Sequence, residues 1–265
     1  MKPTWVARGL LSALYGVGTI LPRKRVPVLI YHSVDDSASP VSIHPHAFRE
    51  HLEVLRDAGC RTTTVSEVVD GLRRDGSAPD GLVALTFDDG FESVYAEALP
   101  ILEEFGFTCS VFLATEYVGK TCTWEKERGV PDLPLMSWKM AKEMGRLGID
   151  FQSHSATHPH LRSLPAERIR KELRRSREAI EDELGTRCDI LCYPYGEFDQ
   201  RVAALLPAEG YVAGFGCTYW GRPGIFSLKR IGSGHLTTPL ALKVALKGYF
   251  DIYYNAKMVA RRVFG

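Results

Sequence analysis

Residues 82–90 read Leu-Val-Ala-Leu-Thr-Phe-Asp-Asp-Gly, an apolar run that ends in two adjacent carboxylates and a glycine. An apolar run of this length, bounded by turn residues, predicts a buried strand over 83–87. Comparable runs alternate with helical patterns along the chain, at 26–31, 109–114, 149–152, 189–193, 212–215 and 225–231. Strands that alternate with helices are typical of a parallel sheet covered by helices. The sequence therefore predicts a single barrel-like α/β domain with about seven strands.

The composition fits one globular domain and gives no sign of a nucleic-acid partner. The chain has 265 residues, 45% hydrophobic and 25% charged, with a formal net charge of +1. That length is sufficient for one large core. Basic residues nevertheless gather near both ends of the chain, at Arg23, Lys24, Arg25, Lys243, Lys247, Lys257, Arg261 and Arg262. Such blocks fit either a solvated face or contact with an anionic surface such as lipid headgroups.

The first 25 residues allow three interpretations. Lys2 and Arg8 precede an uncharged stretch, 9–21, which is too short to span a bilayer and lacks a clear cleavage site. A helix lying on a membrane surface is favoured, ahead of an export signal and of plain core packing.

We divide the chain into this leader (1–25), a barrel (26–238) and an amphipathic basic C-terminal helix (239–265). Peripheral membrane contact through both termini would make the protein membrane-associated. The cytoplasmic face is favoured, and export to the periplasm or cell envelope is the alternative.

Two pairs of polar side chains follow predicted strands and supply the ligands of a metal site. Asp88 and Asp89 come at the end of one strand, and His154 and His158 follow another. The carboxyl ends of strands are where barrel active sites are found. Carboxylate and imidazole are ligands of a zinc-like ion, and a fourth acidic group would be free to move protons. The alternatives are a strand-end turn for Asp-Asp-Gly and structural roles for the histidines.

Three segments together resemble the first three motifs of the polysaccharide deacetylase family, the NodB-homology or carbohydrate esterase 4 group. They are Thr-Phe-Asp-Asp-Gly at 86–90, His-Ser-Ala-Thr-His at 154–158 and Tyr-Pro-Tyr-Gly at 193–196, and the resemblance spans residues 26–235. It implies a distorted (β/α) barrel and a divalent metal, most often Zn²⁺, with Co²⁺, Ni²⁺ or Fe²⁺ also accepted. It also implies hydrolysis of an N-acetyl or similar acyl group on a sugar.

The resemblance also implies roles for individual residues. Asp89, His154 and His158 would bind the metal, and Asp88 would be the general base that takes a proton from the attacking water. The backbone N–H at Tyr195 would help to hold the oxyanion that forms when the amide carbonyl is attacked.

The general acid has two candidates. His235 is a histidine late in the chain, where many members of the family have theirs. Leu-Ile-Tyr-His-Ser-Val at 29–34 instead resembles the first strand of the branch that deacetylates exopolysaccharide poly-N-acetylglucosamine, in which a histidine on that strand supplies the proton. We prefer His32, and the alternative for either histidine is a capping or core role.

One position departs from the family pattern. The family often has an arginine two residues before the proline of its third motif, where it steadies the catalytic aspartate, and this chain has Cys192 there. Arg230, in a late predicted strand, is a candidate replacement, and a surface arginine is the alternative. Among the aromatic residues, Trp220 is predicted to wall the site and Tyr193 to bind substrate, although such residues are more often in the core.

These expectations combine into a metal-dependent deacetylase. Its substrate would be an amino sugar of a polysaccharide, a glycolipid or a lipid-linked glycan. Two alternatives stay open on the same fold: a hydrolase of small non-sugar amides or imides, and a non-catalytic carbohydrate-binding protein. The presence of both Asp88 and Asp89 speaks against the second alternative. The sequence does not indicate whether the protein is a monomer or an oligomer.

Overall fold

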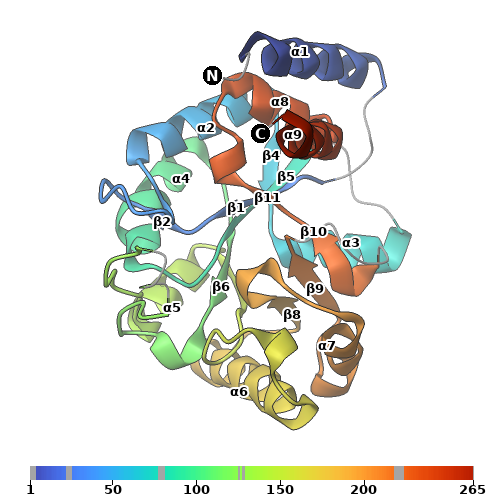
Figure 1. Cartoon of the computed structure of the whole chain (residues 1–265). Coiled ribbons are helices and arrows are strands. Elements are labelled where there is room, and N and C mark those ends of the chain that lie inside the picture. The colour runs from blue at the N-terminus through green and yellow to red at the C-terminus, as the bar shows by residue number, and fades with distance from the viewer. Residues whose placement is uncertain are drawn as a thin grey trace.

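A parallel sheet curls through the centre of the molecule, and helices cover its outside (Figure 1). The structure is a computed structural model that describes residues 4–21, 26–76, 81–124, 126, 129–217 and 224–264. Neighbouring strands pair in the order β10 (Leu228–Lys229), β9 (Ala213–Gly216), β8 (Ile190–Cys192), β7 (Asp150–Ser153), β6 (Ser110–Leu113), β5 (Leu82–Phe87), β1 (Val28–Tyr31) and β11 (Ile231–Gly232). β4 (Arg61–Thr63) adds a further parallel pairing with β5.

The two ends of this path lie on one short segment of chain. β10 pairs with β9 through Leu228, β11 pairs with β1 through Ile231, and Arg230 alone separates the two strands. The sheet is therefore nearly closed into a barrel whose circuit consists of β1, β5 to β9 and the segment 228–232. This confirms the predicted barrel-like α/β domain with about seven parallel strands.

The outer helices bury one apolar stripe each against the sheet. They are α2 (Pro45–Asp57), α3 (Val65–Asp75), α4 (Leu99–Phe105), α5 (Trp138–Arg146), α6 (Ala166–Leu184) and α7 (Gln200–Leu205). On α2, for example, Phe48, Leu52 and Leu55 recur at helical spacing and are fully buried. A π-helical turn, η1 (Val94–Ala98), precedes α4, and β2 (Ser33–Val34) pairs with β3 (Ser42–Ile43) beyond the carboxyl end of β1.

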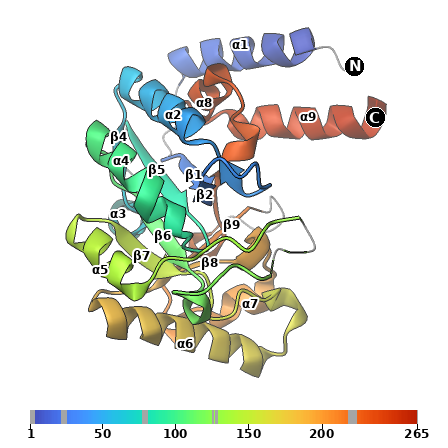
Figure 2. The same ribbon diagram turned by 90° about the vertical axis from the view of Figure 1, so that its left-hand side faces the viewer.

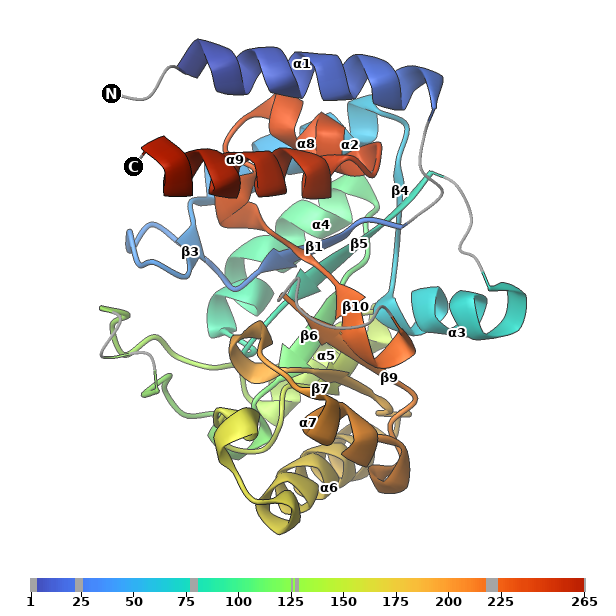
Figure 3. The same ribbon diagram turned by 45° about the vertical axis from the view of Figure 1, so that its right-hand side comes forward.

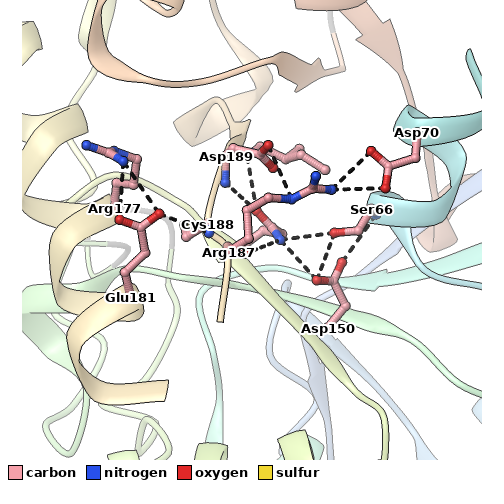
Figure 4. A network of polar contacts seen from close by, with 10 residues as sticks. Ser66, Asp70, Asp150, Arg177, Glu181, Arg187, Cys188 and Asp189 are labelled. Atoms are coloured by element: carbon pink, nitrogen blue, oxygen red, sulfur yellow. Dashed lines mark hydrogen bonds and ion pairs between the residues drawn. The ribbon is translucent and has the colours of Figure 1, made fainter. Parts of the chain in front are cut away.

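The amino ends of β7 and β8 are joined to α3 by a network of polar side chains (Figure 4). Asp150 accepts hydrogen bonds from the hydroxyls of Ser66 at 3.0 Å and Ser110 at 2.9 Å. Arg187 donates to both carboxylate oxygens of Asp70, at 3.0 and 3.1 Å. Because the amino ends of barrel strands generally serve stability, we assign this network to holding the strands and helix together.

The two ends of the chain pack against each other beside the barrel. α1 (Thr4–Ile20) lies against α8 (Pro239–Leu246) and α9 (Phe250–Phe264) (Figure 2). The prediction of one continuous C-terminal helix is wrong, because Gly248 has a φ of 77° and ends α8 before α9 begins. None of the helices in the described ranges has the length and hydropathy needed to cross a bilayer. The division of the chain at residues 25 and 238 stays a prediction.

Candidate metal centre

The carboxyl ends of the strands bring the predicted site residues together. Tyr31 of β1 pairs with Phe87 of β5, so the residues that follow them, His32 and Asp88, are neighbours across the sheet. Because every strand in the barrel is parallel, the residues just beyond β7 and β8 reach the same edge. The site is therefore assembled at one end of the barrel.

Three predicted metal ligands converge at this end. Nε2 of His154 lies 3.5 Å, and Nε2 of His158 3.3 Å, from Oδ1 of Asp89. All three side chains are buried, and one ligand atom from each lies within 4.8 Å of the others. One carboxylate and two imidazoles form a donor set that suits zinc or another divalent transition metal. The residues present therefore fit the metal that the sequence motifs imply.

Hydrogen bonding and burial leave His154 in the form that binds metals. Its Nδ1 lies 2.8 Å from the carbonyl oxygen of Cys192, which requires a proton on Nδ1 and leaves the lone pair on Nε2, facing Asp89. Burial lowers the pKa of His154 to about 4, so the ring is neutral at pH 7. Neutral imidazole is the ligating form.

The loops that carry the ligands adopt backbone conformations that few side chains tolerate. Asp89, Ser155, His158 and Tyr195 have φ values between 53° and 69°, and among the other described non-glycine residues only Ala38 has a positive φ. The four-residue spacing of the histidines is thus set by a loop after β7 and not by a helical turn. Strain of this kind collects at functional sites and persists only where neighbouring contacts hold it.

Glu172 of α6 accepts hydrogen bonds from the loop between His154 and His158, which we call the histidine loop. Its Oε2 accepts hydrogen bonds from the backbone N–H of Ala156 at 3.1 Å and of Thr157 at 2.8 Å, and its Oε1 accepts one from the Thr157 hydroxyl at 2.8 Å. The Glu172 side chain is buried. The sequence pattern does not single out this residue, because a glutamate within the charged stretch 165–184 is usually exposed. Its position three residues after Ile169, on the buried stripe of the helix, was the available signal.

Arg230 forms a buried, two-pronged ion pair with Asp88. Nη1 lies 2.6 Å from Oδ1 and Nη2 lies 2.7 Å from Oδ2, and Nη1 also donates to the Thr86 hydroxyl at 3.1 Å. The alternative of a surface arginine is therefore wrong. Burial alone would raise the pKa of Asp88, but the charge and hydrogen bonds of Arg230 hold that pKa well below its ordinary value. Asp88 is consequently ionised at neutral pH.

A second group of potential ligands, Asp88, His154 and Cys192, overlaps the first. Arg230 contacts both the Asp88 carboxylate and the Cys192 sulfur, and its charge would repel a cation at that point. Burial also raises the pKa of the Cys192 thiol well above its ordinary value, so the sulfur stays protonated. The group that contains Asp89 is therefore the better candidate.

The two candidate general acids lie in different surroundings. Nε2 of His32 is 4.0 Å from Oδ2 of Asp88, and the His32 side chain is 35% exposed. His235 belongs to a short helical turn, η8 (Ser233–His235), is exposed, and packs its ring 5.0 Å from that of Tyr254 in α9. The geometry favours His32, which is partly open to solvent and next to the candidate base.

Aromatic rings border the metal-ligand group. Trp124 stacks on His158 with ring centroids 4.8 Å apart, and Tyr195, in the turn η5 (Pro194–Gly196), meets the same imidazole edge-on at 4.6 Å. Tyr195 also stacks on His160 at 3.8 Å. Trp124 is thus the tryptophan that the described residues place at the site, and Trp220 lies outside them.

The prediction that Tyr193 binds substrate is wrong. Its ring is fully buried, stacks on Phe198 at 4.7 Å, and its hydroxyl donates to the carbonyl of Phe226 at 2.8 Å. Successive side chains of a strand alternate between the two faces. Cys192 therefore points into the barrel, and Tyr193 packs in the outer layer with residues of α6 and α7.

A family model described as polysaccharide deacetylase matches residues 75–214. That span contains Asp88, Tyr195 and the three candidate metal ligands. It contains neither His32 nor Arg230, whose placement in the site comes from the fold alone.

Sequence relatives and solved structures are also similar to this chain. The Bacillus subtilis protein YxkH is 26% identical over 190 residues, which cover 72% of this chain and 63% of YxkH. The poly-beta-1,6-N-acetyl-D-glucosamine N-deacetylase of Escherichia coli K12 is 24% identical over 224 residues, which cover 72% of this chain and 33% of that protein. IcaB from Ammonifex degensii superposes with a TM-score of 0.70 at 26% identity, covering 86% of this chain and 98% of that structure. This chain thus spans less than two thirds of either curated relative.

Removing any one of the three ligands is expected to abolish retention of a divalent metal, because two protein ligands bind zinc too weakly to hold it through gel filtration. We expect the wild-type chain to keep about one zinc ion per molecule after loading and gel filtration. Asp89→Asn, His154→Ala and His158→Ala should keep little zinc by atomic emission. His46→Ala changes an exposed histidine and is the control. Zinc retention by His154→Ala equal to that of the wild type would show that the ion binds elsewhere.

Glu172→Ala is expected to weaken zinc affinity about 10- to 100-fold, because Ala156 and Thr157 lose the acceptor that holds them. Glu172→Gln should keep most of the affinity, since a carboxamide oxygen can accept both N–H bonds. Calorimetric zinc titration of folded protein measures both variants. Glu178→Ala, at an exposed position of the same helix, is the matched control. Unchanged affinity in Glu172→Ala would contradict the positioning role.

Arg230→Lys is expected to lower the free energy of unfolding by about 1–3 kcal/mol, because one ammonium group cannot bond both oxygens of buried Asp88 and Thr86 as well. Urea denaturation measures the loss. Arg168→Lys, at an exposed position of α6, should stay within about 0.5 kcal/mol of the wild type. Equal unfolding midpoints and slopes for Arg230→Lys and wild type would refute the importance of the two-pronged geometry.

Proposed function

Because the chain belongs to the polysaccharide deacetylase family, we propose that it is a metal-dependent hydrolase that removes an N-acetyl group from an amino sugar of a glycan. The observation that carries the proposal is the juxtaposition of two kinds of group at one end of the barrel. A buried donor set for a metal lies beside Asp88, which is ionised and faces His32.

The proposed reaction begins with the attack of water on the amide carbonyl. A divalent metal, when bound by Asp89, His154 and His158, lowers the pKa of water that it contacts and polarises the carbonyl oxygen. Asp88 accepts the proton of the attacking water, and Arg230 fixes the orientation of the carboxylate through two hydrogen bonds. Because Arg230 holds the pKa of Asp88 well below its ordinary value, the carboxylate is in the ionised form that accepts this proton.

Departure of the amine requires a second proton transfer. His32 gives a proton to the leaving nitrogen, and its partial exposure lets the ring recover a proton from solvent. The backbone N–H of Tyr195 donates to the oxyanion of the tetrahedral intermediate. In this scheme the base, Asp88, follows β5 and the acid, His32, follows the adjacent strand β1.

The substrate class that we propose first is a β-1,6-linked polymer of N-acetylglucosamine. The similarity to the E. coli protein whose name gives this substrate supports this choice over other glycans. Trp124, which is partly exposed and stacks on His158, is the aromatic residue to which we assign contact with a sugar ring. Glycolipids and lipid-linked glycans that carry the same sugar fit the same chemistry.

The proposal is tested by acetate release. We expect zinc-loaded protein to release acetate from β-1,6-linked N-acetylglucosamine oligomers, more slowly from β-1,4-linked oligomers, and not from small amides. A chelator should abolish the release, and added zinc should restore it. Acetate release that survives complete removal of metal would refute the mechanism, and turnover of small amides alone would replace the substrate class.

His32→Ala is expected to lower kcat by about 10²- to 10⁴-fold while zinc content stays full, because the leaving amine loses its proton donor. His235→Ala should turn over at a rate close to that of the wild type, since that side chain packs on α9. Near-normal turnover in His32→Ala together with a large loss in His235→Ala would exchange their roles.

A further inference from the structure

Charge in this chain is segregated between its two ends and the barrel. Residues 1–25 and 239–265 together contain ten basic residues and one acidic residue, a net charge of +9. Because the whole chain has a net charge of +1, residues 26–238 have a net charge of −8. A near-neutral total therefore conceals a strongly cationic part and an anionic part.

The fold joins the two cationic ends into one unit, the terminal helices α1, α8 and α9. Leu11 and Leu14 of α1 are buried against the rest of the protein. At Gly18 the α1 backbone approaches α8 so closely that a Cβ would lie 2.6 Å from Cβ of Lys247. The hydroxyl of Tyr249 donates to the carbonyl of Leu21 at 2.7 Å. Among the described side chains, Arg8, Lys243, Lys247 and Lys257 thus belong to one unit beside the barrel.

Most of the large apolar side chains that are exposed to solvent in the described part of the chain belong to this same unit. Val17 is 45% exposed, Ile20 80%, Leu21 65% and Ile252 39%, and Leu147 on the barrel is the fifth such residue. Residues 9–21 contain no charged side chain, although one side of α1 faces solvent from residue 8 to its carboxyl end. Exposed apolar groups gathered in one region mark an interaction surface.

We propose that the terminal helices dock the protein on the surface of an anionic lipid bilayer. Apolar side chains at the carboxyl end of α1 enter the headgroup region, and the surrounding lysines contact anionic headgroups. Nucleic acid would satisfy the charge but would leave the exposed Ile20 and Leu21 without a partner. A bilayer interface satisfies both features, because it presents anionic groups over an apolar interior.

The orientation of the helices relates this surface to the candidate metal centre. The amino end of α1 and the carboxyl end of α9 lie on the same side of the barrel as β3, beyond the carboxyl end of β1 (Figure 3). The exposed Ile20 and Leu21 belong to the other end of α1, which lies on the side of the barrel away from β3. A protein docked through these helices would therefore have the barrel beside the membrane. The inference does not rest on the proposed reaction, since it uses only charge, exposure and packing of helices outside the site.

Co-sedimentation with vesicles tests the proposal. We expect full-length protein to bind vesicles of phosphatidylcholine that contain phosphatidylglycerol, and to bind pure phosphatidylcholine at least tenfold more weakly. Added salt should weaken the binding. The triple variant Lys243→Gln, Lys247→Gln, Lys257→Gln and the double variant Ile20→Ser, Leu21→Ser should each lose at least about tenfold in affinity.

A matched control removes three positive charges from α5 and α6, which lie at the end of the molecule opposite α1 (Figure 2). It changes the exposed residues Lys139 of α5 and Arg168 and Lys171 of α6 to Gln. This variant should bind the anionic vesicles as the wild type does. All variants should keep the wild-type rate of acetate release from soluble oligomers, which separates docking from catalysis. Absence of binding to anionic vesicles, an equal loss in the control variant, or stronger binding to double-stranded DNA than to vesicles would overturn the proposal.

Discussion

The ion pair between Arg230 and Asp88 is the interaction on which the rest of the site depends. Burying an unpaired charge costs several kcal/mol, so neither residue is tolerable at this depth without the other. The arginine meets that requirement with one hydrogen bond to each carboxylate oxygen and a third to Thr86. It is also the residue between β10 and β11, where the sheet closes on itself. The segment that closes the barrel therefore also supplies the positive charge that keeps Asp88 ionised.

The metal-ligand loops show how a strained arrangement is kept in place. Left-handed conformations at Asp89 and His158 cost of order 1–3 kcal/mol each, and they bring side chains from two strands to a common point. Hydrogen bonds to a charged group contribute roughly 1.5–3 kcal/mol each, and Glu172 accepts three from the loop between the histidines. The supporting bonds are thus comparable in size to the strain that they offset. A buried glutamate on an outer helix in this way supports the loop between two candidate metal ligands without being one of the candidate ligands itself.

The candidate catalytic site and the proposed membrane-docking surface lie in different parts of the molecule. The chemistry proposed for the barrel uses groups at the carboxyl ends of its strands, whereas α1, α8 and α9 carry Lys243, Lys257 and most of the exposed large apolar side chains of the described residues. An anionic barrel would be repelled by an anionic bilayer, and a cationic unit at one side would orient it. In the proposed docking, the protein would approach such a surface with the face formed by these helices.

The sequence by itself determined the parallel α/β fold and the local motifs. Apolar runs followed by Asp88-Asp89 and by His154 to His158 carry their meaning in a few adjacent residues, because strand and turn chemistry is local. Only the tertiary structure decided the surroundings of Arg230, the side of the sheet on which Tyr193 lies, and the contact of Glu172 with the histidine loop. Barrel closure pairs Arg230 with a residue 142 positions away, and the packing of α6 on the sheet brings Glu172 back to a loop 15 positions before it. In the sequence, an arginine or glutamate looks the same whether it is buried or exposed. The packing of α1 on α8 and α9 was hidden for the same reason, since both partners lie at opposite ends of the chain.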